Sequence, residues 1–367
     1  MSIFTSTKKL GFGLMRLPLI PGGAETDIDI EHLKKMVDHF MERGFTYFDT
    51  AWMYHGLKSE KAIKKALVER YPRDSYTLTT KFHIGFCDGK DKMEDFFNTQ
   101  LSNTGVDYFD YYLIHDIERG NYANYKEYDA FNWALRKKEK GLIKHLGFSF
   151  HSDAELLDQV LTENPYMEFC QLQINYLDWE SENVQSRRCY EVARKHNCPI
   201  IVMEPVKGGT LVNVPENVKS MFKSKEPDLS IPSWAIRFCA SQPGIEMVLS
   251  GMSNMDQMID NTSYMKDFKP LSEEEINLCV TAGRMISGDI KIPCTGCSYC
   301  TEGCPLKIAI PKLFALYNQD GTDYDAAVGE GSKASKCVGC GQCEGICPQH
   351  LPVTSYLKDV AEKYEAN

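Results

Sequence analysis

The sequence predicts an α/β fold, a (β/α)8 barrel followed by a small, mostly helical domain, from three observations. Short runs rich in β-branched and aromatic residues alternate with amphipathic stretches from Leu10 to about Phe268. Eight such runs over about 250 residues match the strand count and length of this barrel. Beyond them, eight of the 14 cysteines fall after residue 293. We therefore expect a barrel domain over residues 1–286 and a second domain over residues 287–367.

The predicted strands are short and apolar, and helical stretches alternate with them, which indicates parallel strands joined by crossover helices. The strands are Gly11–Met15, Phe45–Asp49, Tyr76–Phe82, Tyr108–His115, Lys144–Phe150, Phe169–Asn175, Ile200–Glu204 and Met247–Gly251. The helices between them are Ile30–Arg43, Glu60–Arg70, Met93–Leu101, Tyr128–Lys140, Ala154–Thr162, Val184–His196 and Pro232–Ala240. An open, doubly wound sheet is the alternative, but no G-x-G-x-x-G turn follows the first strand.

Four further segments are expected after the eighth strand. Ser272–Ile286 predicts a helix, because Ser272 and Glu275 form a capping-box pattern at its start. Ile310–Asn318 and Val353–Lys363 predict two helices of the second domain, and Gly321–Gly331 predicts a polar loop. The second domain is therefore expected to be mostly helical.

The cysteines of the second domain repeat one spacing, C-x2-C-x2-C-x3-C followed by proline. The runs are Cys294, Cys297, Cys300 and Cys304 before Pro305, and Cys337, Cys340, Cys343 and Cys347 before Pro348. Bacterial ferredoxins use this run, and its fourth cysteine binds the other cluster. The spacing therefore predicts a ferredoxin-like domain with two [4Fe-4S] clusters. Their ligands would be Cys294, Cys297, Cys300 and Cys347 for one, and Cys337, Cys340, Cys343 and Cys304 for the other.

Zinc and disulfides are the two other common uses of clustered cysteines. Zinc sites with four thiolates use two separated C-x2-C pairs rather than a close-set quartet. Disulfides would indicate a secreted protein, but the first residues, MSIFTSTKKLGFG, contain no long apolar stretch of a secretion signal. Cluster thiolates and unpaired cysteines such as Cys87 suit the reducing cytoplasm.

The overall composition excludes several classes of protein. The 43% hydrophobic and 25% charged residues are typical of a soluble globular chain with a large core. No apolar run reaches the length that spans a membrane. The net charge of −10 disfavours nucleic acid and anionic membranes as main partners. We expect a cytoplasmic protein that acts on a small molecule.

Four polar residues of different chemistry cluster at the ends of the second, third and fourth predicted strands. They are Asp49, Tyr54, Lys81 and His115. Catalytic residues of barrel enzymes occupy the carboxyl ends of the strands. Reducing a carbonyl requires a hydride at carbon and a proton at oxygen, and a phenol can donate that proton. Lys81 would favour the phenolate of Tyr54, and Asp49 would pair with the buried lysine charge. His115 would orient the carbonyl or share in the proton transfer.

Each of these residues also has an ordinary structural interpretation: a helix cap, a core phenol, a solvated strand end or a core histidine. Their coincidence at three successive strand ends favours chemistry. With them in place, the chain resembles the aldo-keto reductase superfamily, and more narrowly its members with a C-terminal pair of [4Fe-4S] clusters. The resemblance extends from LGFGLMRLP through the cysteine runs. It implies a TIM barrel, reduction of an aldehyde or ketone, and Asp49, Tyr54, Lys81 and His115 as the catalytic tetrad.

The resemblance also implies an NADP or NAD site along the remaining strand ends. Its residues would be Ser149, Gln171 and Met203 near the nicotinamide, Pro205, Lys207, Gly208, Ser250, Gly251, Met252 and Ser253 around the phosphates, and Gln257 and Asn261 near the adenine. Three features depart from the family pattern. Phe150 replaces an asparagine, Met203 replaces a stacking tyrosine, and SGMSNMDQ lacks the basic residue often offered to the 2′-phosphate. An ordinary βα loop is the alternative interpretation of the glycine-rich segment.

A nicotinamide passes two electrons as hydride, whereas an iron–sulfur cluster accepts one at a time. Flavin is the usual cofactor that splits such a pair, and its phosphate could use the same barrel site. Flavin is therefore an alternative to the nicotinamide, unless the clusters serve only as structure.

The leading functional hypothesis is an NAD(P)H-linked reductase of a small carbonyl substrate, with Tyr54 as proton donor and clusters that relay electrons to a partner protein or stabilise the fold. The second is a flavin- or ferredoxin-linked electron-transfer enzyme. The third is a non-enzymatic electron carrier, against which the intact tetrad argues. Trp52, Phe82, His83, Phe150 and Trp179 would form an aromatic substrate pocket or serve as packing residues.

Overall fold

A computed structural model describes residues 3–4, 8–24, 26–319 and 324–365 of the chain. Eight parallel strands form a closed barrel in sequence order, and β1 pairs with β8 to complete it. The strands are β1 (Leu10–Gly13), β2 (Tyr47–Asp49), β3 (Thr77–Phe82), β4 (Phe109–Ile117), β5 (Ile143–Phe150), β6 (Phe169–Gln173), β7 (Ile200–Met203) and β8 (Ile245–Gly251). The predicted (β/α)8 fold is confirmed, and all eight predicted strands are present with boundaries shifted by at most two residues.

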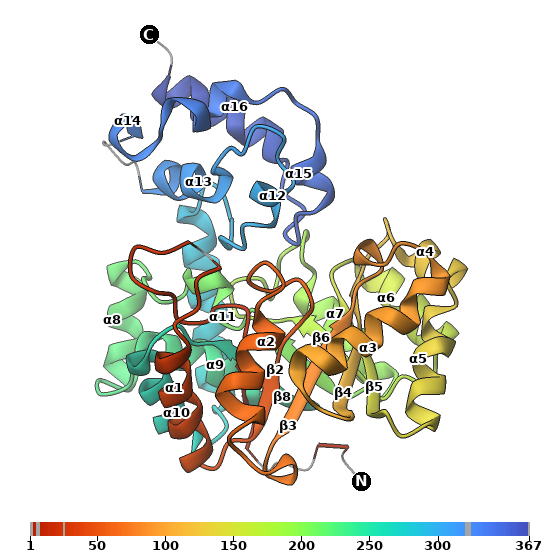
Figure 1. The fold of residues 1–367 in the computed structure, drawn as a ribbon. Coiled ribbons are helices and arrows are strands. Elements are labelled where there is room, and N and C mark those ends of the chain that lie inside the picture. Colours follow the sequence, from red (N-terminus) through yellow and green to blue (C-terminus); the bar gives the residue numbers. More distant parts are fainter. Residues whose placement is uncertain (1–2, 5–7, 25, 320–323, 366–367) are drawn as a thin grey trace.

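Helices surround the barrel on its outer side (Figure 1). They are α1 (Ile30–Glu42), α2 (Ser59–Ile63), α3 (Met93–Thr104), α4 (Tyr122–Glu127), α5 (Ala130–Glu139), α6 (Ala154–Glu163), α7 (Ser186–Lys195), α8 (Glu216–Lys225), α9 (Ile231–Ser241), α10 (Met255–Met265) and α11 (Glu273–Asp289). The predicted helix Glu60–Arg70 is wrong in its second half, where Lys64–Val68 forms a π-helical turn. The sequence did not predict α4 or α8, and α8 buries only Val218 and Phe222, too few residues for a clear apolar stripe.

Side-chain caps fix where several of these helices begin. Asp29, Asp153, Ser230 and Asn254 each accept a hydrogen bond from a backbone N–H in the first turn of α1, α6, α9 and α10. The predicted capping box of α11 is present, with Ser272 as N-cap. This helix continues to Asp289, so the predicted domain boundary at residues 286–287 falls inside its last turn.

Large side chains fill the interior of the barrel at its amino-terminal end. Tyr47, Tyr111, Phe169 and Met247 are buried there, and Phe4 stacks on Tyr111 with ring centroids 5.1 Å apart. Open space inside the barrel is therefore left at the carboxyl ends of the strands.

The C-terminal domain lies over the carboxyl end of the barrel and has a hydrophobic core of its own (Figure 1). Its helices are α12 (Tyr299–Glu302), α13 (Ile310–Asn318), α14 (Tyr324–Ala327), α15 (Gln342–Gly345) and α16 (Val353–Tyr364). The predicted loop Gly321–Gly331 contains the short helix α14, because Tyr324 stacks on Tyr364 at 4.8 Å and anchors the segment. Residues 321–323 of that prediction lie outside the described residues. Among the described helices, none combines the length and apolarity needed to cross a bilayer.

Candidate active site at the barrel mouth

The four residues of the predicted tetrad meet at the carboxyl ends of β2, β3 and β4. Lys81 is fully buried, and its Nζ donates to Asp49 Oδ1 at 2.5 Å and to the Thr50 carbonyl oxygen at 2.8 Å. The same Nζ lies 3.4 Å from the Tyr54 hydroxyl. The Tyr54 and His115 rings are 6.2 Å apart and nearly perpendicular. The closed barrel therefore brings together side chains that come from three separate strands.

Burial dominates the titration of this group. It raises the pKa of Tyr54 well above its usual range, and the carboxylates of Asp49 and Glu204 raise it further. Burial also raises the pKa of Asp49 and lowers that of Lys81, each partly offset by the other's charge. Burial lowers the pKa of His115 well below its usual range. Burial therefore outweighs the effect expected of Lys81 on the pKa of Tyr54. Tyr54 is a neutral phenol that holds its proton, and His115 is a neutral imidazole.

Asp116 and two further histidines adjoin His115 and lie outside the predicted tetrad. His83 Nε2 lies 3.4 Å from Asp116 Oδ2, and His151 Nε2 lies 3.9 Å from Asp116 Oδ1. Burial alone would raise the pKa of Asp116, but the hydrogen bond with His83 and the nearby His151 hold it below its usual range. The signal for Asp116 was available, since it directly follows His115 in YYLIHD.

Glu118, just beyond β4, gives a test of this electrostatic environment. Burial, with a smaller contribution from Asp116, raises the pKa of Glu118 to about 7. The unfolded chain would release this proton near pH ~4.3. The folded state therefore loses stability relative to the unfolded state as pH rises from about 4 to 7. We expect Glu118→Gln to raise the melting temperature, with a gain that is small at pH ~5 and largest above pH ~7.

Melting curves of the wild type and the variant at several pH values would measure this gain. Glu182→Gln is the matched control, because Glu182 is highly exposed on the surface. A gain that is equal at all pH values, or equal in the control, would contradict the assignment.

The tetrad opens into a cavity of about 380 Å³ at the barrel mouth. Asp49, Tyr54 and His115 line it directly, while Lys81 lies behind them. Nine of the twelve predicted cofactor residues also line this cavity. They are Gln171, Met203, Pro205, Gly208, Ser250, Gly251, Ser253, Gln257 and Asn261. Two hydrogen bonds join polar residues of the cavity wall: Asn261 Nδ2 donates to Ser250 Oγ at 2.9 Å, and the Ser253 amide donates to Gln257 Oε1 at 2.7 Å.

The other three predicted cofactor residues are absent from the cavity wall. Ser149 is buried, and its Oγ accepts a hydrogen bond from the Asp116 amide at 2.7 Å. Met252 is fully buried in the barrel core. Lys207 points away into a buried ion pair with Asp178, 2.7 Å from Oδ1. The structure thus brings no Lys207 charge to the cavity, contrary to the predicted phosphate contact.

The predicted aromatic substrate pocket is wrong. None of its five residues lines the cavity. Trp52 packs on Phe96 with ring centroids 4.4 Å apart, and Trp179 packs on Tyr190 and Phe238. The Trp52 and Trp179 rings are therefore packing residues.

Residues from the C-terminal domain form part of the same cavity wall, and no local sequence pattern predicts this arrangement. Cys297, Tyr299, Pro348 and Gln349 all line it. The Tyr299 hydroxyl lies 3.7 Å from the Met15 sulfur in the segment after β1. The site is therefore built by both domains.

Two charged residues at the cavity mouth, Arg16 and Glu204, were not among the predicted site residues. Arg16 donates from Nη2 to the Thr295 carbonyl oxygen at 3.0 Å. Glu204 follows β7 with a left-handed φ of 57°, and its Oε2 is buried without a hydrogen-bond partner among the described residues. Burial raises the pKa of Glu204, and Arg16 and Lys207 partly oppose this shift. Both residues lie in the motifs LGFGLMRLP and MEPVKGG, so the strand-end rule could have found them.

The eight cysteines of the C-terminal domain surround two separate cavities. Cys294, Cys297, Cys300 and Cys347 line one, and Cys304, Cys337, Cys340 and Cys343 line the other. These are the two ligand sets expected from the sequence, each including a cysteine from the other run. All the cysteines are free thiols, which excludes disulfides from this structure. Within the described ranges, no three cysteine, histidine or acidic side chains converge as ligands of a single metal ion. The four thiols that line each cavity match the two ligand sets expected for the clusters.

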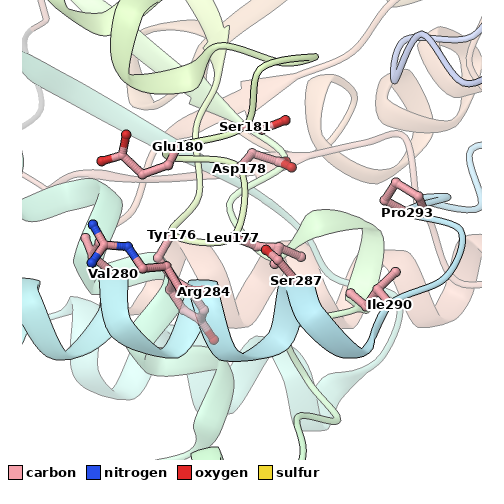
Figure 2. Close-up of a pocket in the computed structure, with 10 residues that line it drawn as sticks. All are labelled: Tyr176, Leu177, Asp178, Glu180, Ser181, Val280, Arg284, Ser287, Ile290 and Pro293. Carbon is pink, nitrogen blue, oxygen red and sulfur yellow. The ribbon is translucent and has the colours of Figure 1, made fainter.

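A second cleft, of about 440 Å³, lies between the segment after β6 and helix α11. Figure 2 shows its lining, with Arg284 and Ser287 on the helix facing Glu180 and Ser181 on the opposite segment. No tetrad residue lines it. The barrel mouth, rather than this larger cleft, therefore carries the candidate chemistry.

Both domains of the chain are similar to known proteins. Residues 9–283 match the Aldo/keto reductase family, and residues 293–351 match the 4Fe-4S dicluster domain. An uncharacterized oxidoreductase, YqkF of Bacillus subtilis, is 22% identical over 273 residues, which is 66% of this chain and 84% of that protein.

Solved structures share the fold. Holo aldo-keto reductase AKR11C1 from Bacillus halodurans superposes with a TM-score of 0.58 at 23% identity, over 75% of this chain and 91% of that one. An aldo/keto reductase from Klebsiella pneumoniae in complex with NADP and acetate superposes with a TM-score of 0.59 at 18% identity, over 76% and 91% of the two chains.

Proposed function

Because the chain belongs to the aldo/keto reductase family and carries a 4Fe-4S dicluster domain, we propose that this oxidoreductase reduces an aldehyde or ketone with NADPH or NADH, and that Tyr54 is the proton donor. The observation that carries the proposal is the convergence of Tyr54, Lys81, Asp49 and His115 at one cavity. This arrangement provides a protonated phenol, a buried cation and a neutral imidazole around the place where a carbonyl oxygen would become negative.

Each residue of the tetrad has a separate task in this chemistry. Tyr54 keeps its proton until negative charge develops on the substrate oxygen, and then donates it. Lys81, 3.4 Å from the Tyr54 hydroxyl, stabilises the phenolate that this transfer leaves. Asp49 balances the buried lysine charge. His115, which is neutral, can donate one hydrogen bond to the carbonyl oxygen and orient it.

The lining of the mouth fits a nicotinamide nucleotide, which would supply the hydride when bound. Gln171 offers a buried amide to the nicotinamide carboxamide, and Met203 a polarisable side chain to its ring. The small residues Ser250, Gly251 and Ser253 precede the N-terminus of α10, where backbone N–H groups and the helix dipole favour a phosphate.

We propose that Arg16, which lines the mouth and donates one of its N–H groups to the Thr295 carbonyl oxygen, offers others to the 2′-phosphate of NADPH. It packs against Gly251, whose added Cβ would lie 3.2 Å from the Arg16 Cβ, and its carbonyl oxygen accepts a hydrogen bond from Ser253 at 2.9 Å. We expect Arg16→Met to raise the dissociation constant of NADPH about tenfold or more, because one charge-assisted contact contributes about 1.5–3 kcal/mol. NADH binding should change little.

Anaerobic fluorescence titration with the two nucleotides would measure both constants, and iron content would verify that the domain interface is intact. Equal losses for NADPH and NADH would contradict a role with the 2′-phosphate.

The eight cysteines fit two [4Fe-4S] clusters by number, type and grouping. The clusters would supply one-electron transfer, and we propose that an electron-transfer protein is their partner.

The second candidate function is electron transfer by a flavin bound in the barrel, because a flavin would join one-electron and two-electron steps.

One experiment separates these functions. Anaerobically purified protein should oxidise NADPH in the presence of a panel of aldehydes and ketones, followed by loss of nucleotide absorbance. Denatured protein should release no flavin fluorescence. Release of stoichiometric flavin, or absence of nucleotide binding and turnover across the panel, would reject the proposal.

A further inference from the structure

A buried polar network joins the loop after β7 to the C-terminal domain. Lys207 Nζ lies 2.7 and 2.8 Å from the two carboxylate oxygens of Asp178, and it also donates to Gln349 Oε1. Gln349 and Gln173 exchange two amide hydrogen bonds of 3.0 and 3.1 Å. Gln173 and Asn175 donate to Asp178 at 3.1 and 2.8 Å. All five side chains are buried. Lys207 is therefore a desolvated cation held between the barrel and residue 349.

A second contact at the neighbouring residue seats the same loop against the C-terminal domain. Gly208 has a φ of 62°, and an added Cβ would lie 2.1 Å from the Thr295 carbonyl oxygen. No side chain fits there without moving backbone. Arg16 donates to the same oxygen, at 3.0 Å. The loop and the domain thus meet through close backbone packing as well as through the network.

Both contacted segments belong to the first cysteine set. Thr295 directly follows Cys294, and Gln349 lies two residues after Cys347. Thr295 and Gln349 also line the cavity that this set surrounds. The cavity of the second set is lined only by residues 304–357 and touches neither Lys207 nor its network. The network therefore contacts the lining of the first cluster cavity and not the lining of the second.

We propose that Lys207 is a positioning residue for the first cluster site, one that locks the Cys347 segment onto the barrel and raises that cluster's reduction potential. Reduction adds one negative charge to a site held by four thiolates. A buried cation stabilises that charge, because low polarity leaves the attraction weakly screened, and net charge around a cluster is one determinant of its potential. The negative charge of Asp178 has the opposite effect and lowers the reduction potential of that cluster.

The other charges at this junction have fixed positions. Arg16 contacts the Thr295 carbonyl oxygen, and Glu204 follows β7 on the same side. Both residues are kept when Lys207 or Asp178 is replaced, although loss of Lys207 would raise the pKa of Glu204 further, because Lys207 opposes the shift that burial causes. The two replacements change the charge of the pair in opposite directions. The inference rests on the dicluster domain and is independent of carbonyl reduction, because potential is measured without substrate.

Redox titration of the anaerobic full-length protein with dithionite, followed by electron paramagnetic resonance, tests the proposal. We expect Lys207→Met to lower the midpoint potential of one cluster and to leave the other unchanged. Asp178→Asn should raise the potential of that same cluster. The opposite signs are the decisive readout, since general loosening of the interface would shift both variants in one direction.

Lys137→Met is the matched control. Lys137 is also a buried lysine paired with a carboxylate, Glu94, but it lies on α5 in the outer ring of the barrel. Neither potential should change in this variant. Unchanged potentials in Lys207→Met with full iron content, or shifts of the same sign in both variants, would overturn the proposal. If Lys207→Met does not fold, Asp178→Asn decides alone: a raised potential supports the proposal, and an unchanged or lowered one overturns it.

Discussion

Replacing Tyr54 with phenylalanine is expected to lower kcat for carbonyl reduction by about 10²- to 10⁴-fold, the usual contribution of a positioned proton donor. The change removes only the hydroxyl that lies 3.4 Å from Lys81 Nζ and leaves the ring against His115. Substrate and nucleotide binding should change little, because the cavity keeps its shape. Steady-state kinetics with a carbonyl substrate, together with nucleotide titration, would separate the loss of kcat from any loss of binding.

Cluster absorbance and iron content should match the wild type in this variant. Tyr190→Phe is the control, since Tyr190 is another phenol with a hydrogen-bonded hydroxyl, which donates to the Pro243 carbonyl oxygen at 2.8 Å, but it lies on α7, in the outer ring of the barrel. If the Tyr54 variant retains normal turnover, proton donation by Tyr54 is wrong, whatever the fate of the iron–sulfur assignment.

Replacing Lys81 with methionine is expected to destabilise the barrel by about 3–5 kcal/mol, the usual effect of removing one partner from a buried ion pair. Asp49 would then be left charged and buried, with its Oδ2 already lacking a partner within the described residues. Denaturant unfolding followed by tryptophan fluorescence would measure the change, since all four tryptophans lie in the barrel.

The double variant Lys81→Met with Asp49→Asn should recover much of this loss, because it removes the unpaired charge. Both variants should lose carbonyl reduction. Lys195→Met is the surface control: its pair with Asp158 is exposed to solvent, so its contribution to stability is small. Equal effects of Lys81→Met and Lys195→Met would show that the buried pair does not stabilise the barrel.

Much of the barrel could be predicted because its information is local. Each strand is a short apolar run, and caps such as Asp153 and Ser272 mark helix starts within one turn. Parallel connection through helices then leaves few possible topologies. The helices that were missed carry weak local signals, as α8 illustrates with its two buried residues.

The tetrad could also be predicted, because the carboxyl ends of parallel strands share one rim. Asp49, Lys81 and His115 needed only their strand positions to be placed together. The pKa of Tyr54 could not be inferred in this way. It depends on burial and on carboxylates from other strands, among them Glu204, and these outweigh the nearby lysine.

The amino-acid sequence by itself determined the barrel, the tetrad and the two cysteine sets, since each follows from spacing along a strand, a turn or a repeated motif. The tertiary structure alone decided how the two domains meet. Lys207 lies in a glycine-rich loop, a position that predicts a phosphate contact, yet its Nζ bonds to Asp178 and Gln349. Its partners lie 29 and 142 residues away along the chain. Contacts over such separations depend on the packing of whole domains, and no local pattern encodes them.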